Sequence, residues 1–123
     1  DEVPCYGDRV IVAVEGDTAR YAVAVPGASK LEYATLRIGV SRASSAGKEV
    51  KVLFNGKPLT VPLEACADRL TGRGTEEKTG YASLKLVSLD PASVKEQNTV
   101  EVSFPDGQPG GIGAVVIRAG YRK

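Results

Sequence analysis

Hydrophobic and polar residues alternate along most of this chain, with the period of two expected of a β-strand that buries one face. In residues 31–40, for example, Leu36, Ile38 and Val40 share one face. Similar runs recur at spacings of about ten residues, separated by clusters of Gly, Pro, Asn, Asp and Ser. The predicted strands are residues 8–14, 19–25, 31–40, 49–54, 58–63, 81–87, 98–104 and 112–118.

No long helical pattern interrupts these strands, so the pattern indicates an all-β chain. About eight short strands with this spacing predict an antiparallel β-sandwich of the jelly-roll kind, with a small barrel as the alternative. A short helix is predicted only within residues 90–97, where Asp90 can cap it and Pro91 fits its first position.

The strongest local signal is Asn55-Gly56, which lies between the predicted strands 49–54 and 58–63. Both central residues of a type I′ turn need positive φ, which Asn and Gly adopt most readily. We therefore predict a tight hairpin at this point, with Val50, Val52 and Phe54 on its buried face.

The length of 123 residues and the hydrophobic content of 42% fit a single globular domain over residues 1–123. A net charge of +1 argues against a nucleic-acid partner, because such proteins normally carry a clear basic excess. No apolar run reaches the roughly 18 residues of a membrane span, so we expect no membrane partner. The chain begins at Asp1 without an initiator Met or signal peptide, which indicates a processed protein or a piece excised from a longer one; we favour a piece excised from a larger enzyme.

The chain contains no histidine and two cysteines. The lack of histidine removes Ser-His-Asp and Cys-His catalysis and His-based zinc sites. Cys5 and Cys66 either form one disulfide, which we predict, or remain two buried thiols.

In an antiparallel up-and-down arrangement, alternate connections lie at the same end of the sandwich. One end then collects residues 15–18, 41–48, 64–80 and 105–111. The opposite end collects residues 26–30, the Asn-Gly turn and residues 88–97. We expect the working surface at the first end, because function usually resides on long loops held by a rigid scaffold. Cys66 belongs to this end and Cys5 to the other, unless residues 2–6 form an extra strand.

Cationic side chains of the first end form the candidate binding set, because guanidinium groups suit sugar hydroxyls and sulfate. The alternative is that they are ordinary surface cations that maintain solubility. Tyr81 opens a strand where its ring could stack on a sugar, and Gln108 offers an amide on a Gly-rich loop. The predicted ligand-binding residues are Arg42, Arg69, Arg73, Lys78, Tyr81 and Gln108.

A catalytic role receives little support from the acidic residues. Glu64, Asp68, Glu76 and Glu77 gather in one long loop, but glycoside hydrolysis needs two carboxyl groups at a fixed separation. We interpret these residues as solvated loop charges and predict no catalytic residue and no enzyme activity. Hydrolysis by a small self-contained enzyme is the least favoured hypothesis.

Three motifs suggest a family. Residues 36–40 form a strand, residues 50–59 a strand–Asn-Gly–Leu hairpin, and residues 98–107 an alternating strand that starts at Asn98 and ends in Asp-Gly. This order resembles the galactose-binding-like β-sandwich modules attached to glycoside hydrolases. More narrowly, it resembles the accessory domains at the C-terminal side of β-agarases and β-porphyranases.

The resemblance implies a non-catalytic carbohydrate-binding module for an algal galactan such as agarose or porphyran. It also implies a catalytic domain in the same parent chain and a secreted or cell-surface location. The chain departs from many sugar binders in having no Trp, which argues against a flat aromatic platform. A structural β-sandwich spacer or interaction domain that binds no sugar is the alternative.

We expect no cofactor, but the resemblance brings a structural calcium ion into consideration. Calcium needs about six to eight oxygen ligands, several of them from carboxylates. Asp1, Glu2, Glu15 and Asp17 are the possible contributors, although their spacing is not diagnostic.

Overall fold

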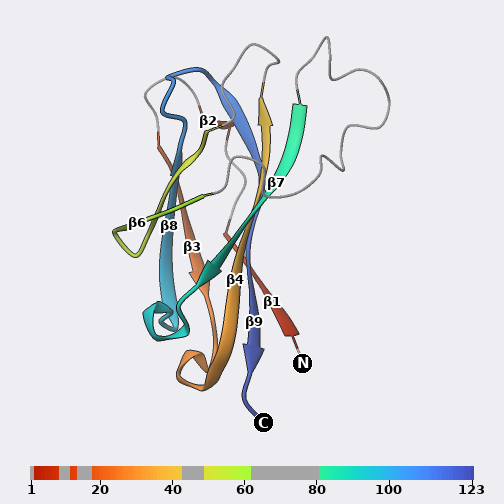
Figure 1. Cartoon of the computed structure of the whole chain (residues 1–123), viewed down its shortest axis with the longest axis vertical. Coiled ribbons are helices and arrows are strands. Elements are labelled where there is room, and N and C mark those ends of the chain that lie inside the picture. The colour runs from red at the N-terminus through yellow and green to blue at the C-terminus, as the bar shows by residue number, and fades with distance from the viewer. Residues whose placement is uncertain (1, 9–11, 14–17, 43–48, 62–80) are drawn as a thin grey trace.

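The computed structural model describes residues 2–8, 12–13, 18–42, 49–61 and 81–123. These residues form two antiparallel sheets that face each other as a sandwich (Figure 1). The elements are β1 (Glu2–Tyr6), β2 (Val12–Ala13), β3 (Ala19–Ala24), η1 (Ala28–Lys30), β4 (Leu31–Arg42), β5 (Lys51–Phe54), β6 (Lys57–Leu59), β7 (Tyr81–Leu89), η2 (Pro91–Ser93), β8 (Gln97–Ser103) and β9 (Gly110–Tyr121). The predicted antiparallel β-sandwich of about eight strands is confirmed.

Sheet A has the strand order β1-β9-β4-β7, and the short β2 also pairs with β9. Sheet B has the order β3-β8-β5-β6. The 12-residue strands β4 and β9 pair along nearly their whole length, with an irregularity between Ile38 and Val40. No helix in the described part of the chain is long and apolar enough to cross a membrane.

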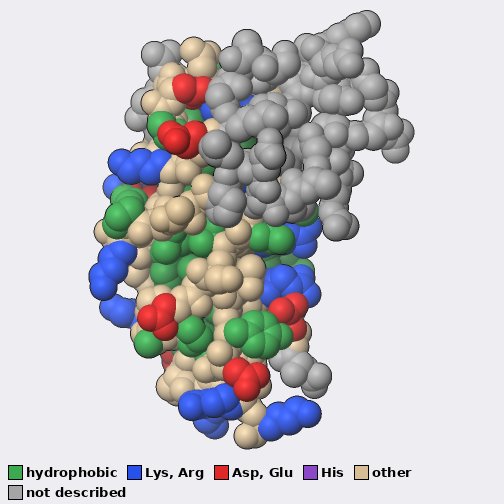
Figure 2. All heavy atoms as spheres, viewed as in Figure 1, with side chains coloured by type: hydrophobic (Ala, Val, Ile, Leu, Met, Phe, Trp, Pro, Cys, Tyr) green, Lys and Arg blue, Asp and Glu red, His purple; other side chains and the backbone are tan. Residues whose placement is uncertain are grey.

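The core lies between the two sheets and contains the residues that the alternation predicted. Leu36, Ile38 and Val40 of β4 are at most 1% exposed, and Val100 and Val102 of β8 are fully buried. In the view of Figure 2, hydrophobic side chains occupy the middle of the described part and charged side chains line its margins.

The Asn-Gly hairpin is also confirmed. Asn55 and Gly56 have φ angles of 50° and 84°, and they join β5 to β6. The Asn55 amide also donates to the Ser93 carbonyl oxygen at 3.2 Å and to the Asn98 Oδ1 at 3.0 Å. These hydrogen bonds join the turn to the segment between β7 and β8, and both connections were predicted at the same end of the sandwich. We call the end that contains the Asn55-Gly56 turn and this segment the turn end.

The short helix predicted after Asp90 is the 3-10 turn η2. Asp90 Oδ1 accepts from the Ala92 backbone N–H at 3.0 Å, and Pro91 occupies the first turn.

The first predicted strand falls largely outside the described part. Of residues 8–14, Val12–Ala13 form β2 and Asp8 lies in a bend, whereas residues 9–11 and 14 are not described. A further strand, β1, covers Glu2–Tyr6. Pro4 obscured β1 in the sequence, because proline is disfavoured within sheets. It is tolerated here because β1 is an edge strand of sheet A. The opposite edge strand, β7, points the side chain of Lys85 inward, a feature that discourages pairing between sheet edges.

Candidate functional site

Three strand ends of sheet A converge at the end of the sandwich opposite the turn end. The register pairs Arg42, the last residue of β4, with Tyr81 at the start of β7 and with Gly110 at the start of β9. The segment between β8 and β9, residues 104–109, lies beside them through its contacts with Arg42. We call this region the loop end.

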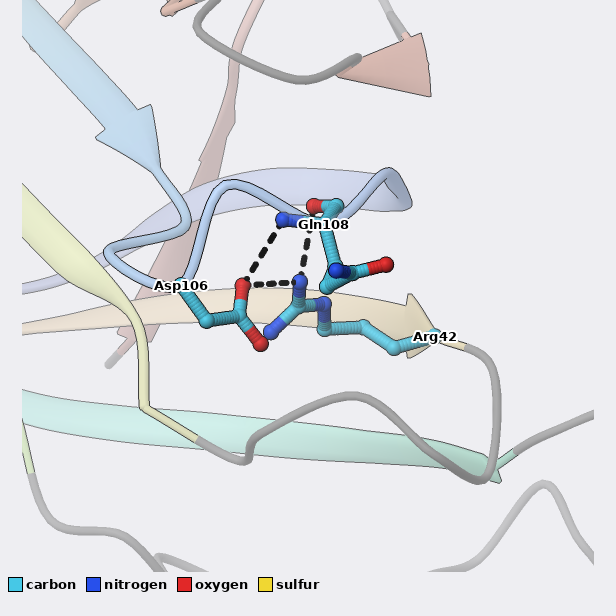
Figure 3. A network of polar contacts seen from close by, with 3 residues as sticks. All are labelled: Arg42, Asp106 and Gln108. Atoms are coloured by element: carbon cyan, nitrogen blue, oxygen red, sulfur yellow. Dashed lines mark hydrogen bonds and ion pairs between the residues drawn. The ribbon is translucent and has the colours of Figure 1, made fainter.

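An ion pair between a buried arginine and a partly exposed aspartate holds the loop end together (Figure 3). The Arg42 side chain is fully buried, and one terminal nitrogen lies 2.6 Å from Asp106 Oδ1. The same nitrogen donates to the backbone carbonyl oxygen of Gln108 at 2.8 Å. The guanidinium also lies over the Phe104 ring, 4.1 Å from its centroid, a geometry suited to a cation–π interaction.

The Asp106 carboxylate organises its own loop as well as binding Arg42. Its Oδ1 also accepts from the Gln108 backbone N–H at 3.0 Å. Gly107 takes a positive φ of 73°, and its N–H donates to the Phe104 carbonyl oxygen at 3.1 Å. The loop between Phe104 and Gly110 is thus closed by its own turn and anchored to β4 by one arginine.

Gly110 is required by this packing. A Cβ atom built on Gly110 would lie 2.7 Å from the Phe104 ring and 3.0 Å from Arg42 Cγ. Only glycine lets the first residue of β9 approach the stacked arginine and phenylalanine so closely.

Arg42 is therefore a strand residue that positions a loop, although the sequence suggested a loop cation available to a ligand. Its role in ligand binding stays a prediction. Gln108 is exposed, and the contacts drawn in Figure 3 are made by its backbone and not by its side-chain amide. Tyr81 opens β7 as predicted, but its side chain is not described. Arg69, Arg73 and Lys78 lie outside the described residues.

The cysteine prediction is not tested. Residues 2–6 do form a strand. In the predicted arrangement, an extra strand at this point allows Cys5 to lie at the same end as Cys66. Cys5 is buried in the core, where burial raises the pKa of a free thiol. Cys66 lies outside the described residues, so the disulfide stays a prediction.

The calcium expectation also falls largely outside the described residues, which exclude Asp1, Glu15 and Asp17. Glu2 is described, and its carboxylate is paired with Arg118 at 2.6 Å. Among the described residues, no group of three or more Cys, Asp and Glu side chains could hold a metal ion.

Sequence reasoning missed Asp106 as the partner of Arg42. One signal was available: the inward alternation of Leu36, Ile38 and Val40 reaches Arg42 two residues later, which predicts a buried arginine. A buried charge needs a partner. The identity of that partner, 64 residues away, was not readable from local pattern.

The comparisons with known proteins agree with the fold. BpGH86A, a beta-porphyranase of glycoside hydrolase family 86 from the human gut bacterium Bacteroides plebeius, matches 99% of this chain with a TM-score of 0.76 and 21% identity. BuGH86, solved in complex with neoagarooctaose, matches 96% with a TM-score of 0.73 and 24% identity. This chain covers only 21% and 18% of those two chains. A search of curated proteins found no match.

A family model is more specific than these structural likenesses. The family described as beta porphyranase A C-terminal matches residues 22–119, which include the loop between β8 and β9 and all of β4. Because the match covers most of the sequence, the chain belongs to the beta porphyranase A C-terminal family.

Proposed function

We propose that this domain is a non-catalytic accessory module that binds a galactan chain of the agarose or porphyran type at its loop end. In this proposal it serves a glycoside hydrolase domain in the same polypeptide, at the cell surface or outside the cell. Family membership supports the association with a galactan-degrading enzyme. The ion pair between buried Arg42 and Asp106 is the observation on which we base this location of the site.

The ion pair supports binding at this end because it makes the scaffold rigid where the loops are attached. The register pairs Arg42 with Tyr81. Residue 43 directly follows Arg42, and residue 80 directly precedes Tyr81. Residues 62–80, which include Arg69, Arg73 and Lys78, therefore join β7 beside the anchored loop that exposes Gln108. A preorganised support lowers the entropy cost of binding a long, flexible polysaccharide.

Native affinity electrophoresis tests the proposal directly. The domain should migrate more slowly in gels that contain agarose or porphyran than in gels without polysaccharide. The Arg69→Ala/Arg73→Ala variant should recover most of the mobility lost in the galactan gels. A matched control is Lys57→Ala/Lys95→Ala, which removes the same charge from exposed positions around the turn end. Equal mobility of the unmodified domain with and without either galactan would refute the proposal.

The non-catalytic part of the proposal needs a separate measurement. Purified domain incubated with neoagarooctaose or a porphyran oligosaccharide should release no new reducing ends. Product formation at a rate proportional to domain concentration would contradict it.

A structural or interaction role is the second candidate function. It is favoured by a specific observation: exposed apolar side chains are concentrated on one face of sheet A. This face does not overlap the buried ion pair of the loop end, so the two functions are compatible.

A further inference from the structure

The outer face of sheet A forms a regular surface across four strands. The register aligns Tyr6 of β1 with Val116 of β9, Val116 with Arg37 of β4, and Arg37 with Leu86 of β7. Two further rows lie toward the turn end. We call the whole surface the tyrosine face: Glu2, Pro4, Tyr6, Tyr33, Thr35, Arg37, Leu86, Ser88, Val116, Arg118 and Gly120.

Exposed apolar area is concentrated on this face. Four large hydrophobic residues are exposed in the described part of the chain, and three of them belong to the tyrosine face: Tyr6 at 68%, Tyr33 at 43% and Leu86 at 39%. Val116 lies in their midst and is only 5% exposed, although it does not belong to the core cluster between the sheets. The face therefore combines a covered apolar centre with aromatic side chains that project into solvent.

Tyr33 is held in place before any partner binds. Its ring packs on the backbone of Gly120, where a Cβ atom would lie 2.1 Å from the ring. Tyr33 and Arg118 both lower the pKa of the Glu2 carboxylate, which is paired with Arg118 at 2.6 Å. A fixed aromatic side chain loses little conformational entropy on binding, as expected of an interface anchor.

The composition of the face is that of a protein interface. Interface centres are enriched in Tyr and Arg and depleted in Lys. The tyrosine face has two Tyr, two Arg and no Lys. The outer face of sheet B, in contrast, has Lys51, the Arg20–Glu101 ion pair and no aromatic residue among its register positions.

The size of the face also fits a contact between domains. Four strands spaced about 4.8 Å apart and rows two residues apart make an array of roughly 14 by 13 Å. With side chains at its margins, one such face covers about 400 Å², or about 800 Å² over two partners, which lies within the range of interfaces between domains.

We infer that the tyrosine face docks against the catalytic part of the same polypeptide. The chain belongs to a C-terminal domain family, and it covers only about a fifth of the solved relatives. Strand β1 is an edge of this sheet, and the pairing of Glu2 with Gly120 places both chain ends beside the face (Figure 1). A polypeptide joined through Asp1 would thus start at its border. This inference depends on family membership and does not require sugar binding.

Hydroxyl-radical footprinting compares the isolated 123-residue chain with the full-length polypeptide that contains it. Oxidation of Tyr6 and Tyr33 should fall about fivefold in the full-length polypeptide, because contact centres exclude water. Leu53, on the outer face of sheet B, is the internal reference and should change little. Unchanged oxidation of both tyrosines, or a gene product without a glycoside hydrolase domain, would overturn the inference.

A pair of variants separates docking from folding. Tyr6→Ser/Arg37→Glu should leave the melting temperature of the isolated chain nearly unchanged, but should uncouple the melting of this domain from that of the catalytic domain in the full-length polypeptide. Thr99→Ser/Lys51→Glu makes the same charge change on sheet B and should do neither.

Two further outcomes would assign the face to another occupant and overturn docking in cis. One is a dimer of the isolated chain in sedimentation that Tyr6→Ser/Arg37→Glu dissolves. The other is loss of galactan retardation in that variant. Failure of galactan binding through the loop end leaves the footprinting result unaffected, so the two proposals fail separately.

Discussion

Two arginine–carboxylate pairs on sheet A have the same separation of 2.6 Å but very different surroundings. At the loop end, the Arg42 side chain is fully buried and stacks on Phe104. On the tyrosine face, the Arg118 side chain is 39% exposed and its partner Glu2 is 33% exposed. The distance alone would rank the two pairs as equal. Burial gives the two pairs very different expected contributions to stability. Water screens the exposed pair, whereas the buried Arg42 cation depends on its partner for compensation of its charge.

The comparison separates two roles for charge in this domain. The buried pair fixes a loop to a strand and so shapes the loop end. The exposed pair adds little to folding but joins Glu2 to Arg118 on a surface that we propose to be an interface. Substitutions that break one pair should therefore affect folding, and substitutions that break the other should affect surface properties.

The largest effect should come from Asp106→Ala. It leaves the fully buried Arg42 guanidinium without its carboxylate and also removes the acceptor for the Gln108 N–H. Because an uncompensated buried charge is costly, we expect the free energy of unfolding to fall by about 3 kcal/mol. Urea denaturation of the isolated chain measures the change. Glu2→Ala is the matched control and should shift the midpoint much less; equal shifts would contradict the ranking by burial.

Arg42→Met should be less destabilising than Asp106→Ala. It removes the cation as well as the ion pair, and it leaves Asp106, whose side chain is 32% exposed and can be solvated. Methionine also retains apolar contact with Phe104, so we expect a loss of about 2 kcal/mol. A double-mutant cycle with Asp106→Ala should show strong coupling, with the double variant close to Arg42→Met alone. Additive losses would show that the two side chains act independently.

Replacing a glycine by alanine at the loop end and on the tyrosine face compares how tightly the two regions are packed. Gly110→Ala places a Cβ atom 2.7 Å from the Phe104 ring, and Phe104 is only 7% exposed and cannot easily move. We expect a loss of about 1.5 kcal/mol from overpacking. Gly120→Ala produces a shorter contact, 2.1 Å from Tyr33, but that ring is 43% exposed and can swing into solvent.

Gly120→Ala should therefore cost less than about 1 kcal/mol. It should still raise the oxidation of Tyr33 in footprinting of the isolated chain, since the ring loses its support. The reverse order of stability losses would mean that contact distance, and not the freedom of the neighbouring side chain, determines the cost.

The sandwich was predictable from sequence because its signals are local. Alternation marked the buried faces of β4 and β8, and Asn55-Gly56 marked the hairpin through backbone conformation alone. Strand β1 was only an alternative in the sequence, because it contains Pro4 and shows little alternation at a sheet edge.

The candidate sites were harder to predict because they depend on pairing between distant strands. No local pattern places Tyr6 and Tyr33 on one exposed face; only the register of β1, β9 and β4 does so. Asn98 appeared to start a strand. Its buried amide in fact donates to the carbonyl oxygens of Val23 at 3.1 Å and Lys95 at 2.6 Å, which joins segments far apart in the chain. The positions of Arg69, Arg73 and Lys78 in a long Gly- and Thr-rich segment provide no local constraint on where their side chains lie.

The smallest effect should come from titrating the exposed pair. The hydrogen bond from Arg118 lowers the pKa of Glu2 below its ordinary value, and the hydroxyl of Tyr33 lowers it further. Since the folded pKa lies below the unfolded one, the pair contributes stability above about pH 4.3 and loses it as the pH falls through the folded pKa.

An NMR titration of the Glu2 carboxyl should show the lowered pKa, and Arg118→Gln should return it toward the ordinary value. Arg122→Gln, which removes a cation that binds the Ser29 carbonyl oxygen, is the control and should leave the pKa of Glu2 nearly unchanged. Added salt should weaken the shift, because this pair is exposed to solvent. A lowered pKa of Glu2 that survives Arg118→Gln would show that Arg118 is not the main cause of the shift.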